Sequence, residues 1–285
     1  MKVKFNLVPS YNFKKNKYLN NSIYFMHVPK SGGTTIDHIF AKLSHILKNF
    51  DFHRIKYNKN NYKERLLPFD FKKQKPKFIS GHLNYDFCDD IKNCFKFTIV
   101  REPIQRIISN YKFTLHNNRK DPSEFPFEYF IKNEVENFRD NLITRQFSGQ
   151  YSSGKPISRK ALDIAIQNIN YFDMVNTLEN WDIFLSNILS KFELPSVLYS
   201  RYQEHNYNFS FIPTKENLNL LKKYYGLDYD LYKKISKKET NQSYKYRNDN
   251  LEKICIVSPY LKSENKLFSK EELSRLFKSN DKLDL

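Results

Sequence analysis

Glycine is scarce in this chain, with only 6 glycines among 285 residues. Two of them, Gly32 and Gly33, are adjacent, which indicates a backbone conformation that other residues adopt poorly. Cysteine is also rare: the chain has Cys88, Cys94 and Cys255 and no CxxC pair, so neither a zinc site nor a disulfide framework is indicated. Cys88 and Cys94 could pair in an oxidising compartment, but a reduced interior is the simpler expectation.

Long apolar runs are missing too. No stretch approaches the roughly 20 apolar residues of a membrane span, and the N-terminus lacks the apolar region of a signal peptide. We therefore expect a soluble, cytoplasmic protein. Apolar residues still make up 40% of the chain and aromatic residues 16%, enough for the core of one large α/β domain.

Acidic residues are too few to balance the basic ones. The chain has 48 Lys and Arg against 31 Asp and Glu, a formal charge of +17. This excess indicates an anionic partner, such as a nucleotide, an acidic glycan, a nucleic acid or an anionic lipid. Lysine is abundant along the whole chain, so much of this charge could equally be solvated surface.

The chain is organised around residues 23–35. The apolar run 23–26 predicts a buried strand, Pro29 begins a tight loop, and a helical apolar pattern follows over residues 36–47. A strand, a glycine loop and a helix N-terminus together form an anion site, because backbone N–H groups and the helix dipole favour negative charge. Lys30 precedes the glycines, whereas in the nucleotide-hydrolase P-loop the lysine follows them. This order favours a single 5′-phosphate or a phosphosulfate over γ-phosphate chemistry.

Strands and helices alternate along the rest of the chain, which predicts a three-layer α/β/α fold around a central parallel sheet. We expect further strands at 77–80, 95–100 and 172–177, an edge strand at 197–199, and helices from Pro103, within 124–147 in two parts, from Ser158, and over 179–192, 214–225 and 228–236. The connection 49–76 is expected to contain only short helical pieces. In domain terms, residues 1–21 read as a polar lead-in, 22–236 as the main domain and 237–285 as an extension of unknown role.

Three polar clusters directly follow strand candidates, at 29–35, 81–85 and 101–109. Ligands of parallel sheets bind beyond the carboxyl ends of the strands, so these clusters should meet at one edge. In the last cluster, the Arg101 guanidinium can hold a phosphate with two hydrogen bonds, and Ser109 can add a hydroxyl.

The first and third clusters resemble known motifs. The stretch HVPKSGGTT resembles the 5′-phosphosulfate loop of sulfotransferases that use 3′-phosphoadenosine-5′-phosphosulfate (PAPS), and VREPIQRIISNY resembles their 3′-phosphate motif. The chain is most similar to the carbohydrate sulfotransferases that include heparan sulfate 2-O-sulfotransferase and bacterial relatives. Gly81-His82 and the stretches 140–149 and 173–185 are also similar, and the resemblance covers roughly residues 22–236. It implies a P-loop-like sulfotransferase fold.

The resemblance also implies roles for individual residues. His82 would act as the base that takes the proton of the acceptor hydroxyl, a task that suits an ordinary histidine pKa of roughly 6.5. Lys30 would neutralise the leaving phosphate, so no metal is required. The 5′-phosphosulfate would be held by Lys30, Ser31, Gly32, Gly33, Thr34 and Thr35, the 3′-phosphate by Arg101 and Ser109, and the nucleotide or acceptor also by Arg145.

One departure concerns the histidines. Some relatives have His-Gly-His where this chain has Ser80-Gly81-His82, which weakens any inference of the same acceptor. His116 is a weaker candidate base, and we assign His27 and the other histidines structural or surface roles.

The leading hypothesis is therefore transfer of a sulfuryl group from PAPS to a hydroxyl, with a saccharide favoured as acceptor and a protein tyrosine still open. We expect no specific nucleic-acid partner, and contact with a membrane surface only if the acceptor is lipid-linked. The oligomeric state is not indicated. Two alternatives remain: a P-loop kinase of a nucleotide or small molecule that uses ATP and magnesium, and a basic polyanion-binding protein.

Overall fold

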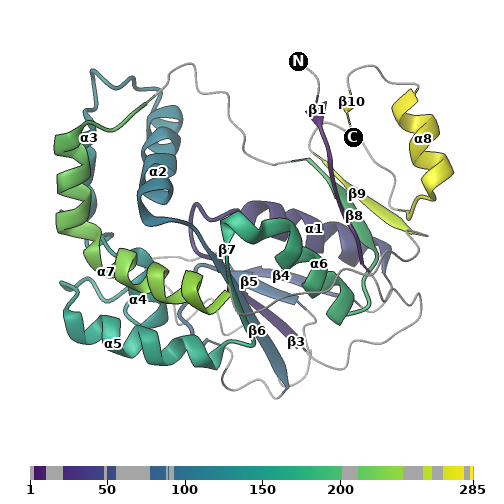
Figure 1. Ribbon diagram of the computed structural model, residues 1–285, viewed down its shortest axis with the longest axis horizontal. Coiled ribbons are helices and arrows are strands. Elements are labelled where there is room, and N and C mark those ends of the chain that lie inside the picture. The colour runs from purple at the N-terminus through teal and green to yellow at the C-terminus, as the bar shows by residue number, and fades with distance from the viewer. Residues whose placement is uncertain are drawn as a thin grey trace.

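The computed structural model describes residues 3–10, 22–47, 50–55, 78–87, 89, 93–200, 211–239, 253–258, 266–278 and 283–284. Within these residues, five parallel strands form a central sheet in the order β4-β5-β3-β6-β7 (Figure 1). Their bounds are β3 (Ser22–Met26), β4 (Phe52–Ile55), β5 (Phe78–Gly81), β6 (Cys94–Val100) and β7 (Met174–Thr177). The predicted parallel sheet is thus confirmed. The prediction of only short helical pieces over 49–76 is wrong at β4, which pairs with β5 at the sheet edge.

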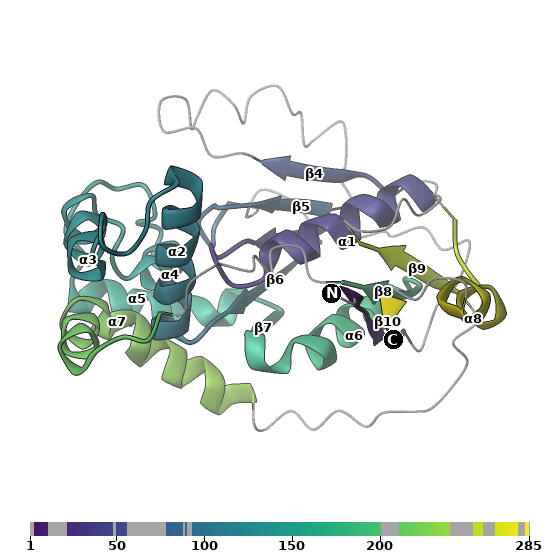
Figure 2. The same ribbon diagram turned by 90° about the horizontal axis from the view of Figure 1, so that it is seen from above.

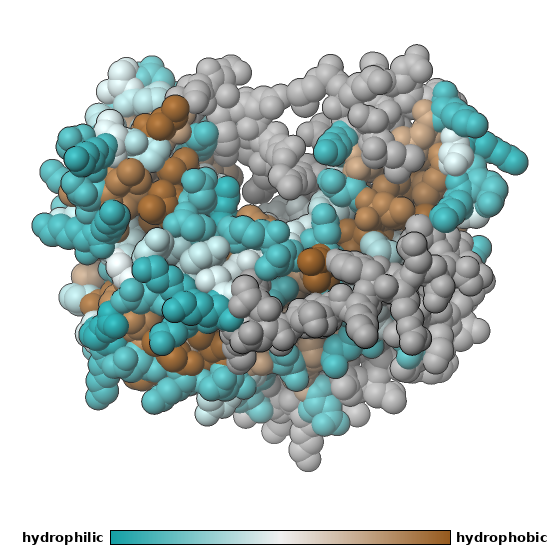
Figure 3. Space-filling model, viewed as in Figure 1, coloured by the Kyte–Doolittle hydropathy of each residue, from teal (hydrophilic) through white to brown (hydrophobic). Residues whose placement is uncertain are grey.

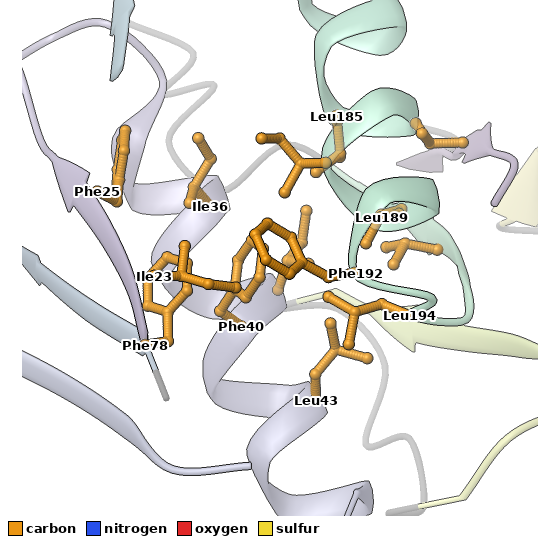
Figure 4. Packing of buried hydrophobic residues seen from close by; sticks show 14 of the residues in the cluster. Ile23, Phe25, Ile36, Phe40, Leu43, Phe78, Leu185, Leu189, Phe192 and Leu194 are labelled. Atoms are coloured by element: carbon orange, nitrogen blue, oxygen red, sulfur yellow. The ribbon is translucent and has the colours of Figure 1, made fainter. Parts of the chain in front are cut away.

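Helices cover both faces of this sheet. Successive side chains of β3 point to opposite faces, as the strand pleat requires. Ile23 and Phe25 pack with α1 (Gly33–Ile46) and α6 (Trp181–Lys191). Tyr24 and Met26 pack on the other face with α4 (Leu142–Phe147), α5 (Arg159–Asn168) and α7 (Lys215–Glu239). Figure 4 shows the first face, with Phe40 of α1 and Leu189 of α6 closing the core. The three-layer α/β/α arrangement is confirmed.

A third apolar cluster joins α2 (Pro103–Asn118), α3 (Phe127–Glu136) and α7. Helix α2 begins as predicted: Pro103 lies in its first turn, and the Glu102 side chain accepts a hydrogen bond from the Gln105 N–H. The two helices predicted over 214–225 and 228–236 are one helix, α7, which is kinked at Tyr225. The kink lies where the sequence indicates the break between them.

A second sheet lies beyond α1 and α6, and its strands are β2 (Asn6–Val8), β8 (Ser196–Tyr199) and β9 (Ile254–Val257) in the order β2-β8-β9 (Figure 2). The strand predicted at the sheet edge, 197–199, is therefore the middle strand of a separate sheet. It pairs antiparallel with β2 from the predicted lead-in and parallel with β9 from the predicted extension.

Strands β8 and β9 of the second sheet are buried on both faces, whereas Leu7 of β2 is exposed. On one side Val197 and Cys255 join the core under α1 and α6. On the other, Leu198 and Ile256 pack with Leu273 of α8 (Lys270–Lys278), and Figure 3 shows apolar residues gathered in this region. A short parallel pair, β1 (Val3–Lys4) with β10 (Leu283–Asp284), lies beside it. Among the described helices, none is both long and apolar enough to cross a membrane.

Candidate active site

The loops that follow β5, β3 and β6 begin at the same edge of the sheet. These strands are neighbours, all parallel, and Met26 at the end of β3 is in register with Gly81 of β5 and Thr98 of β6. The Thr98 hydroxyl donates to the Met26 carbonyl at 2.7 Å. The prediction that the three polar clusters meet at one edge is confirmed.

The glycine loop, residues 28–33, joins β3 to α1 through an unusual backbone. Lys30 and Gly32 have φ angles of 66° and 81°, both in the left-handed region. This conformation suits Gly32, but at Lys30 it costs roughly 1–3 kcal/mol, a cost that is typical of functional sites. The Thr35 N–H donates to the Gly32 carbonyl at 3.0 Å, and no described side chain caps the N-terminus of α1. The first turn of α1 therefore keeps N–H groups for an anion.

Ser31 points to the same ligand chemistry. It is fully buried, and its hydroxyl has no hydrogen-bond partner among the described residues. A buried hydroxyl without a partner costs about 1–3 kcal/mol, which a bound oxyanion would recover. The next two hydroxyls of the motif, Thr34 and Thr35, lie in the first turn of α1, half-buried and buried respectively.

Two cations lie at the mouth of the glycine loop. The Lys30 ammonium lies 3.9 Å from the centroid of the Phe113 ring on α2. Burial, together with the nearby charge of Arg101, lowers the Lys30 pKa to about 8. Two positive groups near each other repel, and an anion bound beside them would relieve this repulsion. Arg101 follows the end of β6 and Ser109 lies on α2, both half-buried.

His82 directly follows β5, which lies on the opposite side of β3 from β6. Its ring centroid is 4.5 Å from that of His27 at a nearly perpendicular angle, and its buried Nε2 has no hydrogen-bond partner in the described part of the chain. Burial lowers the His82 pKa to about 3, with smaller lowering by His27 and Arg54 and an opposing effect of Asp37. His82 is therefore neutral near pH 7, and its low pKa, in contrast to the ordinary value expected from the sequence, makes it a weak proton acceptor without a further negative charge nearby.

A buried carboxylate that the sequence prediction missed lies beside these histidines. Asp37, in the first turns of α1, is 3% exposed. Its Oδ2 lies 3.3 Å from His27 Nδ1 and 3.3 Å from Arg54 Nε, and its Oδ1 accepts a hydrogen bond from the Ser80 hydroxyl. The sequence held one signal for it: Asp37 is a charged residue within the apolar stripe of α1, where charges are rarely buried unless paired.

The comparison with known proteins decides the family of this chain. A sequence profile described as "Sulfotransferase family" matches residues 19–235, most of the chain. The chain belongs to the sulfotransferase family. A protein-tyrosine sulfotransferase of Arabidopsis thaliana is 30% identical over 104 residues, which are 36% of this chain and 19% of that protein. The chain thus matches about a fifth of the length of this curated relative.

Two solved structures share part of this arrangement of helices and strands. A sulfotransferase from Alicyclobacillus acidocaldarius superposes with a TM-score of 0.44 at 8% identity, over 79% of this chain and 98% of that one. An uncharacterized protein from Eubacterium ventriosum superposes with a TM-score of 0.32 at 8% identity, over 61% and 99% of the two chains.

Helix α4 holds two of the strand ends in place. The buried Gln146 amide donates to the carbonyls of His27 at 3.3 Å and Leu83 at 3.1 Å. The backbone carbonyl of Gln146 accepts a hydrogen bond from the Tyr85 N–H at 3.2 Å. Gln146 therefore ties the end of β3 to the loop after β5 and fixes the separation between the glycine loop and His82. Sequence reasoning did not single it out.

Arg145, which the resemblance assigns to the nucleotide or acceptor, is held by the chain around α4. It is 1% exposed, and its guanidinium donates to the Asp140 carbonyl, the Asp140 carboxylate and the Lys155 carbonyl at 2.7–2.9 Å. All three nitrogens thus bind the chain on either side of α4, and we leave Arg145 out of the proposed site. His116 is exposed near the end of α2, about 20 Å along the helix from Pro103.

Cys88 lies outside the described residues, so the expectation that it stays reduced and does not pair with Cys94 remains a prediction. Cys94 and the buried Cys255 form no disulfide with a described residue. Within the described ranges, no group of three or more His, Cys, Asp or Glu side chains is placed to hold a metal ion.

We expect Gly33→Ala to damage both the fold and the glycine loop. A Cβ atom at residue 33 would lie 2.1 Å from Cδ2 of the His27 ring, which packs against Phe25 and His82 while Gln146 holds the His27 backbone carbonyl. Overpacking of this kind typically costs about 1–3 kcal/mol of unfolding free energy, measurable by urea denaturation. Gly226→Ala is the matched control, because a Cβ there has no heavy atom within 4 Å. Equal stability of the two variants would contradict the close packing of His27 on the loop.

Proposed function

We propose that this sulfotransferase transfers the sulfuryl group of PAPS to a hydroxyl of a saccharide, and that residues 22–236 carry the site. The observation that carries the proposal is the buried, unpartnered Ser31 hydroxyl in a glycine loop whose mouth holds two mutually repelling cations, Lys30 and Arg101. A nucleotide that is phosphorylated at both ends of its ribose would supply anions to both. Sulfotransferases of this family generally use PAPS as donor.

The residues of the glycine loop fit the 5′-phosphosulfate. Ser31 would donate its free hydroxyl hydrogen, and the N–H groups at the start of α1 would add the helix dipole. Lys30 would place a full charge beside the oxygen that bridges phosphorus and sulfur. Thr34 and Thr35 offer further hydroxyls from the first turn of α1.

Arg101 and Ser109 would hold the 3′-phosphate. The planar guanidinium matches two phosphate oxygens at once, and the hydroxyl gives a third hydrogen bond. Both residues are half-buried, and both lie on the segment that leads from β6 into α2. The same anion would relieve the repulsion between Arg101 and Lys30.

Transfer would then proceed by in-line displacement, as in phosphoryl transfer. The acceptor oxygen forms a bond to sulfur while the bond from sulfur to the bridging oxygen breaks. His82 Nε2 takes the proton of the acceptor hydroxyl, and Lys30 neutralises the negative charge that develops on the leaving phosphate. The released products are the sulfated acceptor and 3′-phosphoadenosine-5′-phosphate (PAP).

Donor binding would also strengthen the base. Without a ligand the His82 pKa is lowered to about 3, mainly because burial disfavours the charged ring. A bound donor brings several negative charges to the neighbouring loop, and nearby negative charge raises a histidine pKa. His82 would therefore become a better proton acceptor when the donor is in place.

The proposed acceptor rests on two unequal supports. Resemblance of the His82 turn and of the anion motifs to carbohydrate sulfotransferases favours a saccharide, and the charge of +17 favours an acidic one. The second candidate is a protein tyrosine, which the similarity to a protein-tyrosine sulfotransferase favours over one segment of 104 residues.

Two experiments test this function in sequence. Thermal unfolding with PAP, ATP and AMP comes first, and we expect PAP to stabilise the protein most, because only PAP fills both anion positions. A labelled donor is then offered to acidic polysaccharides, neutral oligosaccharides and tyrosine-containing peptides. Stabilisation by ATP with magnesium, and transfer of its γ-phosphate, would instead favour a kinase. Salt-dependent DNA binding without nucleotide preference would favour a polyanion-binding protein.

We expect the affinity for PAP to fall as the pH rises through about 8. The Lys30 pKa is lowered to about 8, so the free enzyme loses this charge above that pH, and a charge-assisted contact is worth roughly tenfold in affinity. Calorimetric titration of PAP at pH 7.0 and 9.5 measures the difference. Lys30→Arg is the control, since arginine stays charged at both pH values. An equal loss in wild type and Lys30→Arg would exclude Lys30 as the titrating group.

A further inference from the structure

We propose that Asp37 and His27 form a positioning pair that orients His82 and adjusts how readily it accepts a proton. The pair links the two halves of the site, because Asp37 lies on the helix that begins at the glycine loop and His27 ends the strand before it. This inference rests on the proposed role of His82 as base and gives two further residues a part in the same step.

The Asp37 carboxylate is held from several sides. It is 3% exposed, its Oδ2 lies 3.3 Å from His27 Nδ1, and its Oδ1 accepts the hydrogen bond of Ser80, two residues before His82. Desolvating a carboxylate costs several kcal/mol, and these partners only offset that cost. Nδ1 and Oδ2 lie within ion-pair distance but form no hydrogen bond in the described part of the chain, so the carboxylate acts on the His27 ring through its charge and through close packing.

His27 transmits this constraint to His82. Its ring is 4% exposed and lies between the Phe25 ring, stacked with centroids 5.5 Å apart, and the His82 ring at 4.5 Å. The edge of the His27 ring also faces Gly33, where even a methyl group would clash. The ring therefore cannot turn without moving the glycine loop or His82. A shift of the loop on donor binding would reach the base through His27.

The charges around His82 act in opposite directions. Asp37 on α1 raises the His82 pKa, whereas Arg54 on β4 and His27 on β3 lower it. Arg54 also contacts Asp37 directly, so the two charges compete at one carboxylate oxygen. Substitutions that remove one charge should thus shift the His82 titration in a direction set by the sign of that charge.

The alternative is a purely structural pair that fastens α1 to β3. Such a pair would lower stability when broken, and activity only in proportion. It would not produce titration shifts of opposite sign, nor would it lower turnover while leaving donor affinity unchanged. These two readouts separate the alternatives.

The decisive experiment follows the His82 ring by NMR in enzyme with ¹³C-labelled histidine, saturated with PAP, and His82→Gln assigns the signal. We expect Asp37→Asn to lower the pH midpoint of His82 and Arg54→Met to raise it, each by about 0.5–1 pH unit. Asp163→Asn, at an exposed position of α5, should shift it by no more than about 0.1 unit. A pH midpoint of His82 that is unchanged in both Asp37→Asn and Arg54→Met would overturn the proposed positioning pair.

A second readout guards against an Asp37→Asn variant that fails to fold. Arg54→Met removes an exposed side chain and should fold, so its upward shift alone suffices to support or overturn the electrostatic part. For folded Asp37→Asn, we expect turnover to fall at least tenfold with the PAP dissociation constant within twofold of wild type. Adding His27→Phe to Asp37→Asn should then lower turnover little further, because the two substitutions break the same contact. Additive losses would overturn the pair. Failure of wild type to bind PAP would instead overturn the proposed function.

Discussion

His82→Ala should abolish sulfuryl transfer and leave PAP binding within about twofold of wild type. The ring lies beside the glycine loop strand, and its buried Nε2 has no hydrogen-bond partner among the described residues, so we assign it the acceptor proton and no contact with the donor. Loss of a general base typically costs 10²–10⁴-fold in rate, and here the loss should fall on turnover. Initial rates with labelled donor and calorimetry with PAP measure the two effects separately.

His116→Ala is the natural comparison for this prediction. His116 is exposed near the far end of α2, and its removal should leave turnover unchanged. Near-wild-type turnover of His82→Ala would exclude His82 as base. A large loss in His116→Ala alone would transfer the assignment to that residue.

Arg101→Ala should weaken PAP binding about 10–100-fold, the value of one charge-assisted, two-point contact. The affinity for AMP, which lacks the 3′-phosphate, should change far less. The substitution also removes a charge that lowers the Lys30 pKa, so the fall of affinity with pH should begin above pH 8. Calorimetric titrations of both nucleotides at several pH values test all three expectations.

Arg101→Lys separates charge from geometry in the same experiment. It keeps the positive charge but loses the planar pair of donors, so we expect an intermediate affinity for PAP. Equal loss of PAP and AMP affinity in Arg101→Ala would contradict the 3′-phosphate assignment, because a residue specific for that phosphate cannot affect a ligand without it.

Much of the central sheet could be predicted because its strands are strongly apolar and each is followed by a recognisable helix. The runs 23–26 and 95–100 are buried on both faces, which is typical of central parallel strands. Strand β4 escaped prediction because Phe52–Ile55 is short, carries the exposed Arg54 and has a neighbour on one side only. The local hydrophobic pattern is a poor predictor of such an edge strand.

The strands that pair with β8 could not be predicted, for a different reason. The sequence indicates a strand at 197–199, but its place depends on β2 and β9, which lie far away along the chain. Pairing over such separations is decided by which surfaces remain to be covered once the first layers have formed. An apolar run of four residues does not encode that information.

Some features of the candidate site could be predicted from the sequence, and others could not. Loop and strand order predicted the convergence of Lys30, His82 and Arg101, because parallel topology alone brings strand ends together. The contacts of Asp37 and Gln146 arise only when α1 and α4 pack against β3 and β5. The surroundings of Arg145 could not be predicted either, because its three hydrogen bonds come from Asp140 and Lys155 on the two sides of α4.

The mixed origin of the second sheet has a consequence for how the protein is made. Ser10, next to β2, donates to Ser196, which lies 186 positions later, and β9 emerges from the ribosome later still. Helix α1 packs against β9, so the helix that begins at the glycine loop reaches its full set of contacts only when nearly all of the described chain has been synthesised. Such distant pairings fold slowly and leave apolar surface uncovered in the meantime. During synthesis, the nascent chain should therefore depend on chaperones most strongly while residues 196–254 are being added.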